Sequence, residues 1–193
     1  MNFESLVLTG EAVRLEPLTT AHYQALCEVA LDPQMWQWTI SQVLTPEAMR
    51  RYIEAALEAR DAGTALPFAT VDLQSGKVVG STRFGNIDQA NRRVEIGWTF
   101  VASPWQRTRI NTEAKYLMLQ HAFETLGCIR VELKTDALNA KSRAAILRLG
   151  ATEEGTFRNH MIVAGGRIRD TVYFSIIESE WPSVRASLQS RLR

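Results

Sequence analysis

Cysteine and histidine are scarce in this chain, which has two cysteines and three histidines among 193 residues. Cys27 and Cys128 show neither metal-ligand nor redox spacing, and the histidines are as scattered as the cysteines. The sequence therefore predicts no metal site. It favours two reduced thiols that are buried or half-buried, with a covalent acyl-cysteine as the alternative.

Long hydrophobic runs and an excess of one charge are also missing. The net charge is +1, which gives no overall attraction for nucleic acid or an anionic membrane, and no segment approaches ~18 consecutive apolar residues. The stretch Met1–Gly10 has neither a basic start nor an apolar run. We therefore expect a cytoplasmic protein that binds neither membrane nor nucleic acid. Anion binding would need a local cluster, for which Arg107, Arg109 and Lys115 are the candidates.

The size and the 46% hydrophobic content suit one domain over residues 1–193. Apolar periodicity and turn residues predict an α+β fold with a mixed sheet. The predicted strands are 12–17, 67–73, 77–85, 94–101, 129–135, 156–163 and 168–177. The predicted helices are 21–31, 46–62, 110–126, 139–149 and 181–192. Residues 32–39 are predicted as a loop.

The most informative stretch is the strand 94–101, which Pro104 ends before a long helix. A second strand, 129–135, follows that helix, and the short crossover should place the two strands parallel and adjacent. A helix that starts directly after a strand leaves its first backbone N–H groups unpaired at its positive end. Such an end suits a pyrophosphate.

Short sequence motifs in this region resemble those of the GNAT superfamily of N-acetyltransferases, in particular the branch with the ribosomal-protein N-terminal (Rim-type) enzymes. They are Glu95-Ile96-Gly97-Trp98, Asn111-Thr112-Glu113-Ala114-Lys115, His121-Ala122-Phe123-Glu124, Ser142-Arg143, Leu149-Gly150-Ala151 and Glu180-Trp181-Pro182. The resemblance implies a mostly antiparallel mixed sheet, splayed at the cofactor site and flanked by helices. It also implies transfer of an acetyl group from acetyl-CoA to an amine, with CoA as the product.

The family's phosphate loop usually reads Gln or Arg, two residues, Gly, one residue, then Gly or Ala. Gln106 matches, but Arg109 and Asn111 stand at the glycine positions. Backbone donors remain, and arginine side chains can crowd a phosphate or pair with it. Carried over residue by residue, the cofactor-binding set is Thr99, Phe100, Val101, Gln106, Arg107, Thr108, Arg109, Ile110, Asn111, Thr112, Asn139 and Ser142.

Ser142 follows Asn139 by one turn and is the proton donor that the resemblance implies for the departing CoA thiolate. Many superfamily members use a tyrosine one further turn along, where this chain has Ile146. Asn139 has two compatible roles, as a helix cap and as a contact for pantetheine. An ordinary helix serine is the alternative reading of Ser142.

Glu95 is the leading carboxylate to take the proton of the attacking amine, with Glu132 as a weaker candidate. It alternates with apolar neighbours in a central strand, where a charged residue needs a partner. A salt bridge to Arg83 or Arg93 is therefore the structural alternative.

Trp36 and Trp38 lie in the predicted loop 32–39, which forms the acceptor pocket in the resembling family, although packing alone would also explain each ring. The acceptor is expected to be a protein or peptide N-terminal amine or a small-molecule amine. Two rival functions stay open: a non-catalytic acyl-CoA-binding sensor and a peptide-binding module without cofactor. The sequence also leaves a homodimer open.

Overall fold

Eight strands form one mixed sheet in the computed structural model, which describes residues 6–193. Their order across the sheet is β1-β2-β3-β4-β5-β6-β8-β7. The strands are β1 (Leu8–Thr9), β2 (Val13–Pro17), β3 (Leu66–Asp72), β4 (Val78–Asp88), β5 (Arg93–Val101), β6 (Arg130–Asp136), β7 (Thr152–Ile162) and β8 (Ile168–Ile177). All neighbours are antiparallel except β5 and β6. The predicted mixed, mostly antiparallel sheet is confirmed.

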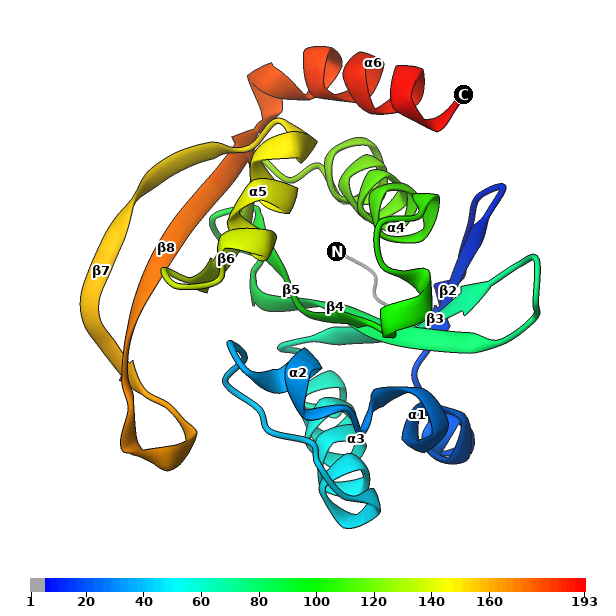
Figure 1. Cartoon of the computed structure of the whole chain (residues 1–193). Helices are drawn as coiled ribbons and strands as arrows, with labels where there is room; N and C mark the ends of the chain where they lie inside the picture. The colour runs from blue at the N-terminus through cyan, green and yellow to red at the C-terminus, as the bar shows by residue number, and fades with distance from the viewer. Residues whose placement is uncertain (1–5) are drawn as a thin grey trace.

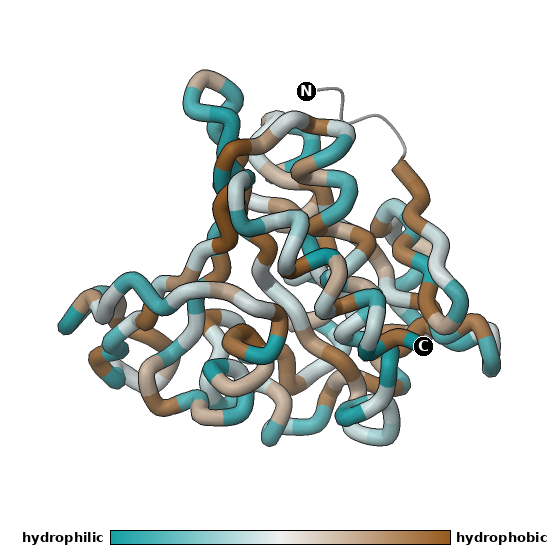
Figure 2. The backbone as a smooth tube through the Cα atoms, turned by 90° about the horizontal axis from the view of Figure 1, so that it is seen from above, coloured by the Kyte–Doolittle hydropathy of each residue, from teal (hydrophilic) through white to brown (hydrophobic). Residues whose placement is uncertain are grey.

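Helices cover both faces of this sheet (Figure 1). They are α1 (Tyr23–Ala30), α2 (Pro33–Trp36), α3 (Pro46–Asp61), α4 (Arg109–Gln120), α5 (Ala140–Leu149) and α6 (Trp181–Leu192). The larger hydrophobic core lies between the sheet and α4, α5 and α6, and the smaller one lies under α1, α2 and α3. Figure 2 shows the hydrophobic segments mostly inside and hydrophilic ones at the projecting loops.

Local sequence explains where the helices that frame the site begin and end. Thr45 caps α3 with Pro46 in its first turn, Thr108 caps α4, and Asn139 caps α5. Gly150 ends α5 with a φ of +98°, in the left-handed region where glycine carries little strain.

The parallel pair β5 and β6 separates along its length, as the family resemblance implied for the cofactor site. Only three positions are paired, from Arg93 with Arg130 to Glu95 with Glu132, although β5 runs on to Val101 and β6 to Asp136. The second half of β5 therefore has no strand partner on the β6 side.

A β-bulge lies in the same half of β5. Ser81 pairs with Phe100 while Arg83 pairs with Gly97, so β5 holds one residue more than β4 between these positions. Trp98 lies within this bulge and has a φ of +49°, which is rare for a residue with a side chain. The bulge turns local backbone groups away from the regular ladder.

The structure adds details that the sequence analysis did not predict. Residues 33–36 form a short helix inside the predicted loop, residues 8–9 form a strand, and β7 starts four residues earlier than predicted. Asp32 accepts a hydrogen bond from the Gln34 N–H and Pro33 occupies the first turn, which explains the short helix. Residues 1–5, part of the N-terminal stretch considered above, lie outside the described residues.

Candidate active site

The loop between β5 and α4 presents backbone donors at one end of the gap between β5 and β6. The Thr108 hydroxyl accepts a hydrogen bond from the Ile110 N–H at 3.3 Å and donates to the Trp105 carbonyl at 2.7 Å. Arg107 has a φ of +61°, so this loop adopts a left-handed turn without a glycine. The other N–H groups of the first turn have no partner within the helix. These groups fit the pyrophosphate of CoA.

The arginine cluster expected from the sequence is only partly formed. Arg107 and Arg109 are exposed beside this loop, and Arg109 pairs with Glu11 at 2.9 Å and also donates to the Leu192 carbonyl. Lys115 does not belong to the cluster, because it is buried on the sheet side of α4. The expectation for Lys115 was wrong, since residue 115 lies next to Ala114 on the apolar face of the helix.

Glu113 fixes α4 against the sheet. Its carboxylate accepts three backbone N–H groups, from Glu11, Ala12 and Val13, at 2.7 to 2.9 Å. Because the side chain is 4% exposed, these contacts join the second turn of α4 to the start of β2. They hold the donor end of the helix in place beside β5.

The bulge in β5 is held from both faces of the sheet. On the α3 side, the Tyr52 hydroxyl donates to the Trp98 carbonyl at 3.2 Å. On the α4 side, the Lys115 ammonium nitrogen bonds the hydroxyls of Thr82 at 2.9 Å and Thr99 at 2.5 Å. Burial lowers the pKa of Lys115 to about 7. Two helices thus position the strand segment for which the sequence analysis predicted pantetheine contacts.

The predicted cofactor residues Thr99, Phe100 and Val101 line this segment in different ways. The Phe100 side chain packs in the smaller core against Trp36 and Tyr52. Only the backbone of Phe100 is therefore available to a ligand between β5 and β6. The Gln106 amide donates to the Val101 carbonyl at 2.9 Å, which ties the loop back to the end of β5.

The start of α5 lies beyond the carboxyl end of β6. The Asn139 side chain accepts a hydrogen bond from the Ser142 N–H at 3.0 Å, so its capping role is present. The Ser142 hydroxyl makes no hydrogen bond to another residue in the range 6–193 and is half-buried. A hydroxyl in this state is free to donate a proton to a bound group.

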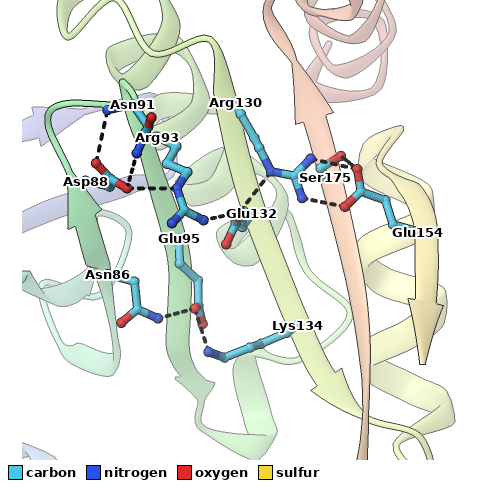
Figure 3. A network of polar contacts seen from close by, with 10 residues as sticks. All are labelled: Asn86, Asp88, Asn91, Arg93, Glu95, Arg130, Glu132, Lys134, Glu154 and Ser175. Atoms are coloured by element: carbon cyan, nitrogen blue, oxygen red, sulfur yellow. Dashed lines mark hydrogen bonds and ion pairs between the residues drawn. The ribbon is translucent and has the colours of Figure 1, made fainter. Parts of the chain in front are cut away.

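Glu95 is 3% exposed and its partners are not the arginines that the sequence analysis named. Its Oε2 atom accepts from the Asn86 amide at 2.7 Å and pairs with the Lys134 ammonium at 2.8 Å (Figure 3). Glu95 pairs with Glu132 in the strand register, and Lys134 lies two residues further along β6, at the diagonal position on the same face. The arginine expectation was wrong, while the expected need for a partner was correct.

Glu132, the weaker base candidate, lies in a separate ion-pair network. Arg93 and Arg130 both donate to its Oε1 atom, at 3.0 and 2.9 Å (Figure 3). Arg130 also binds Glu154, and this contact lowers the pKa of Glu154 to about 2. Because two guanidinium groups hold Glu132, it is poorly placed to accept a proton.

These side chains line an open pocket of about 520 Å³ on the face of β5 and β6 opposite α4. Glu95, Lys134 and Tyr173 form part of its wall, and Lys134 lies 5.6 Å from the Tyr173 ring centroid.

The two tryptophans have different positions. Trp36 is 2% exposed and its indole N–H donates to the Ala30 carbonyl at 2.7 Å, so the ring belongs to the core and does not line an open pocket. Trp38 is half-buried, with the Arg167 guanidinium 5.3 Å from its ring centroid. This contact joins the loop after α2 to the β7–β8 hairpin. Trp38 stays a candidate for acceptor binding.

Cys128 is buried, and burial raises the pKa of its thiol to about 11. Cys27 is half-buried. Both positions agree with the expected buried or half-buried thiols, and the raised pKa of Cys128 is the opposite of what a nucleophilic cysteine needs.

The sequence analysis missed Tyr52 and the Trp98 bulge, and it considered Arg83 only as a partner for Glu95. Gly85 and Gly97 are the signals that were available. A Cβ atom at Gly85 would lie 2.3 Å from the Trp98 ring, and one at Gly97 would lie 2.8 Å from Glu95 Oε1. A glycine inside a strand often marks a bulge or the close approach of another group.

Known acetyltransferases are similar to this chain in sequence. A family model described as an acetyltransferase (GNAT) domain matches residues 12–152. YdaF of Bacillus subtilis (strain 168), provisionally named a ribosomal N-acetyltransferase, is 34% identical over 143 residues, which are 74% of this chain and 72% of that protein.

Solved structures give the same result. A GCN5-related N-acetyltransferase from Brucella melitensis has 35% identity and a TM-score of 0.91, covering 98% of this chain and 86% of its own. RimJ of Mycobacterium smegmatis, in complex with CoA-disulfide, has 25% identity and a TM-score of 0.81, covering 97% and 93%. No helix within residues 6–193 has the length and apolar character needed to cross a membrane.

Proposed function

The chain belongs to the GNAT family of acetyltransferases, and on this basis we propose that it acetylates a primary amine, preferably a peptide or protein N-terminal amine, by direct attack in a ternary complex. Acetyl-CoA, when bound, supplies the acetyl group as a thioester. The observation that carries the proposal is the splayed gap between β5 and β6, with the bulge at Trp98 on one side and the donor end of α4 at its mouth.

In this proposal the protein first positions acetyl-CoA and then stabilises the negative charge that develops on the thioester oxygen. The loop from Gln106 to Thr112 binds the pyrophosphate through backbone N–H groups, and the free edge of β5 binds the pantetheine arm. A backbone N–H at the bulge donates a hydrogen bond to the developing oxyanion. Because Tyr52 and Lys115 hold the bulge in place, little reorganisation is needed when this charge forms.

Proton transfers complete the reaction. The attacking amine must be neutral, and its excess proton leaves through water or Glu95, whose Oε1 has no hydrogen bond to another residue in the range 6–193. The Ser142 hydroxyl donates a proton to the departing CoA sulfur. Asn139 keeps Ser142 in the first turn of α5 by binding its N–H.

The chemistry of the base favours an α-amine over a lysine side chain. Neutralising an α-amine of pKa ~8 at pH 7 costs about 1.4 kcal/mol, and neutralising a lysine of pKa ~10.4 costs about 4.6 kcal/mol. Glu95 already binds Lys134 and Asn86 through Oε2, so only its Oε1 is left to accept a proton. A site with one candidate base should select the amine that loses its proton more easily.

The experiment has a binding part and a turnover part. Acetyl-CoA should raise the melting temperature, because a ligand that binds the native state alone stabilises it, and NAD or ATP should raise it much less. CoA release should then follow when lysine-free peptides with a free N-terminus are added. Stabilisation by acetyl-CoA without CoA release from any amine would indicate a sensor instead. An unchanged melting temperature at millimolar acetyl-CoA would contradict the cofactor assignment.

A further inference from the structure

Arg83 on β4 carries a buried positive charge that no residue in the range 6–193 neutralises. The residue is 5% exposed, no carboxylate lies within 4.0 Å of it, and its Nε atom is buried without a hydrogen-bond partner. A guanidinium stays protonated in proteins, so the charge persists at every physiological pH. A buried charge of this kind calls for a counter-ion.

Two aromatic rings meet only part of this need. The Arg83 guanidinium lies 5.2 Å from the ring centroid of Tyr52 and 5.0 Å from that of Trp98. Such contacts recover only part of the free energy that removing an ion from water costs. The rings contact the guanidinium but accept no hydrogen bond from its Nε–H, which has no partner among residues 6–193.

The strand register places Arg83 beside the bulge in β5. Arg83 pairs with Gly97 and Gly85 pairs with Glu95, so both charged side chains lie on the same face of the β4–β5 pair, next to the bulge. This is the face with the open pocket, opposite the side that α4 covers. Arg83 therefore adjoins the place where the acceptor amine meets the bulge.

The carboxylates nearby already have cations of their own. Glu95 pairs with Lys134, and Asp136 pairs with Arg167 at 2.5 Å and with Arg169 at 4.0 Å. Neither carboxylate forms an ion pair with Arg83, so the charge of Arg83 stays without a counter-ion among residues 6–193. This unpaired charge favours a ligand with a negative group.

We propose that Arg83 binds a carboxylate that the acceptor carries close to its amine. This proposal rests on the proposed function and narrows its substrate class to acidic amines. The two N–H groups of a guanidinium edge match the two oxygens of a carboxylate, which is the geometry of the strongest such pairs. The carboxylate belongs either to an acidic first residue of a peptide or to a free amino acid.

The test compares acceptors that differ in charge alone. Lysine-free peptides that begin with Asp or Glu are matched with peptides that begin with Asn or Gln, and free glutamate is matched with its diamide. A charge-assisted pair contributes about 1.5 to 3 kcal/mol, so kcat/KM should be about 10- to 100-fold higher for acidic acceptors. A preference among the peptides would assign the carboxylate to an acidic first residue, and a preference for free glutamate would assign it to a free amino acid.

Arg83→Gln should abolish the preference by raising KM for the acidic acceptors, while the constants for neutral acceptors change only a few-fold. Arg83→Lys keeps the positive charge but lacks the two parallel N–H donors of a guanidinium, so it should retain part of the preference for acidic acceptors. Arg60→Gln, at an exposed arginine of α3, is the matched control and should behave as the wild type. Melting curves with acetyl-CoA verify that each variant folds and binds the cofactor.

Equal use of acidic and neutral acceptors by the wild type would overturn the proposal. An equal loss for both kinds in Arg83→Gln would do the same, because it would indicate a structural role. Acceptor binding, measured by calorimetry in the presence of CoA, distinguishes failure of the proposed function from failure of the role assigned to Arg83. Charge-selective binding without turnover would refute the proposed function alone, and turnover without charge selectivity would refute the role of Arg83 alone.

Discussion

Replacing Lys115 by methionine should remove most of the dependence of stability on pH between pH 7 and pH 9. The side chain is 5% exposed, and its ammonium contacts two threonine hydroxyls and no carboxylate among residues 6–193. Burial lowers the pKa of Lys115 from 10.5 to about 7. Between these two values the unfolded chain binds one proton more than the folded chain, so stability must rise with pH.

The magnitude follows from the two pKa values. One proton difference changes the free energy of unfolding by about 1.4 kcal/mol per pH unit, which gives about 2 to 3 kcal/mol from pH 7 to pH 9. Below pH 7 the full cost of charging the buried amine applies, about 5 kcal/mol. Lys115→Met removes this cost, and the hydroxyls of Thr82 and Thr99 still have each other as partners at 2.8 Å. The variant should therefore be more stable than the wild type at pH 6.5.

Other groups with shifted pKa values titrate outside this window. Burial lowers the pKa of His121 below its ordinary value of 6.5, so its destabilising effect disappears as the pH rises to about 6.5. The raised pKa of Cys128, about 11 instead of 9.0, reduces stability only above pH 9. The assay is urea unfolding monitored by circular dichroism at constant ionic strength, with the exposed Lys77→Met as control. A Lys115→Met variant with the same pH slope as the wild type would refute the reasoning.

Three further predictions concern the site. Ser142→Ala should reduce kcat by about 100-fold or more and leave the affinity for acetyl-CoA within a few-fold, as single-turnover kinetics and calorimetry can measure; unaltered chemistry would remove the hydroxyl from the mechanism. Arg107→Gly should raise stability by up to about 1 kcal/mol, because it relieves a left-handed backbone, and should preserve acetyl-CoA affinity; a tenfold weaker Kd would instead assign the phosphate contact to the side chain. Tyr52→Phe removes the hydrogen bond to the bulge and should lower turnover several-fold with a loss of about 1 kcal/mol in stability; unchanged turnover would separate the bulge from catalysis.

Local chemistry explains why the fold could be predicted from the sequence. Pro104 and Gly127 mark element ends, Thr108 and Asn139 are cap-type residues, and each of these signals depends on neighbours along the chain. The structure confirms the parallel pair and its splay, which the family resemblance implied. The order of elements around the site needed no knowledge of tertiary contacts.

Contacts across the sheet explain what could not be predicted. Alternation along β5 gives the face on which Glu95 lies, but its partner depends on the register with β6, which places Lys134 and not an arginine beside it. The burial of Trp36 depends on the packing of Tyr52 and Phe100 from two other elements. The burial of Lys115, by contrast, could have been predicted, because Lys115 lies one turn before Met118 on the apolar face of α4.

The most direct test of the account is transfer to paired peptides, read by mass spectrometry after incubation with acetyl-CoA across pH 6 to 9. One peptide has a free N-terminus and no lysine, and the other has a blocked N-terminus and one lysine. The account predicts acetylation of the first peptide, increasing as the α-amine loses its proton, and little of the second. Acetylation of the lysine peptide alone would contradict it.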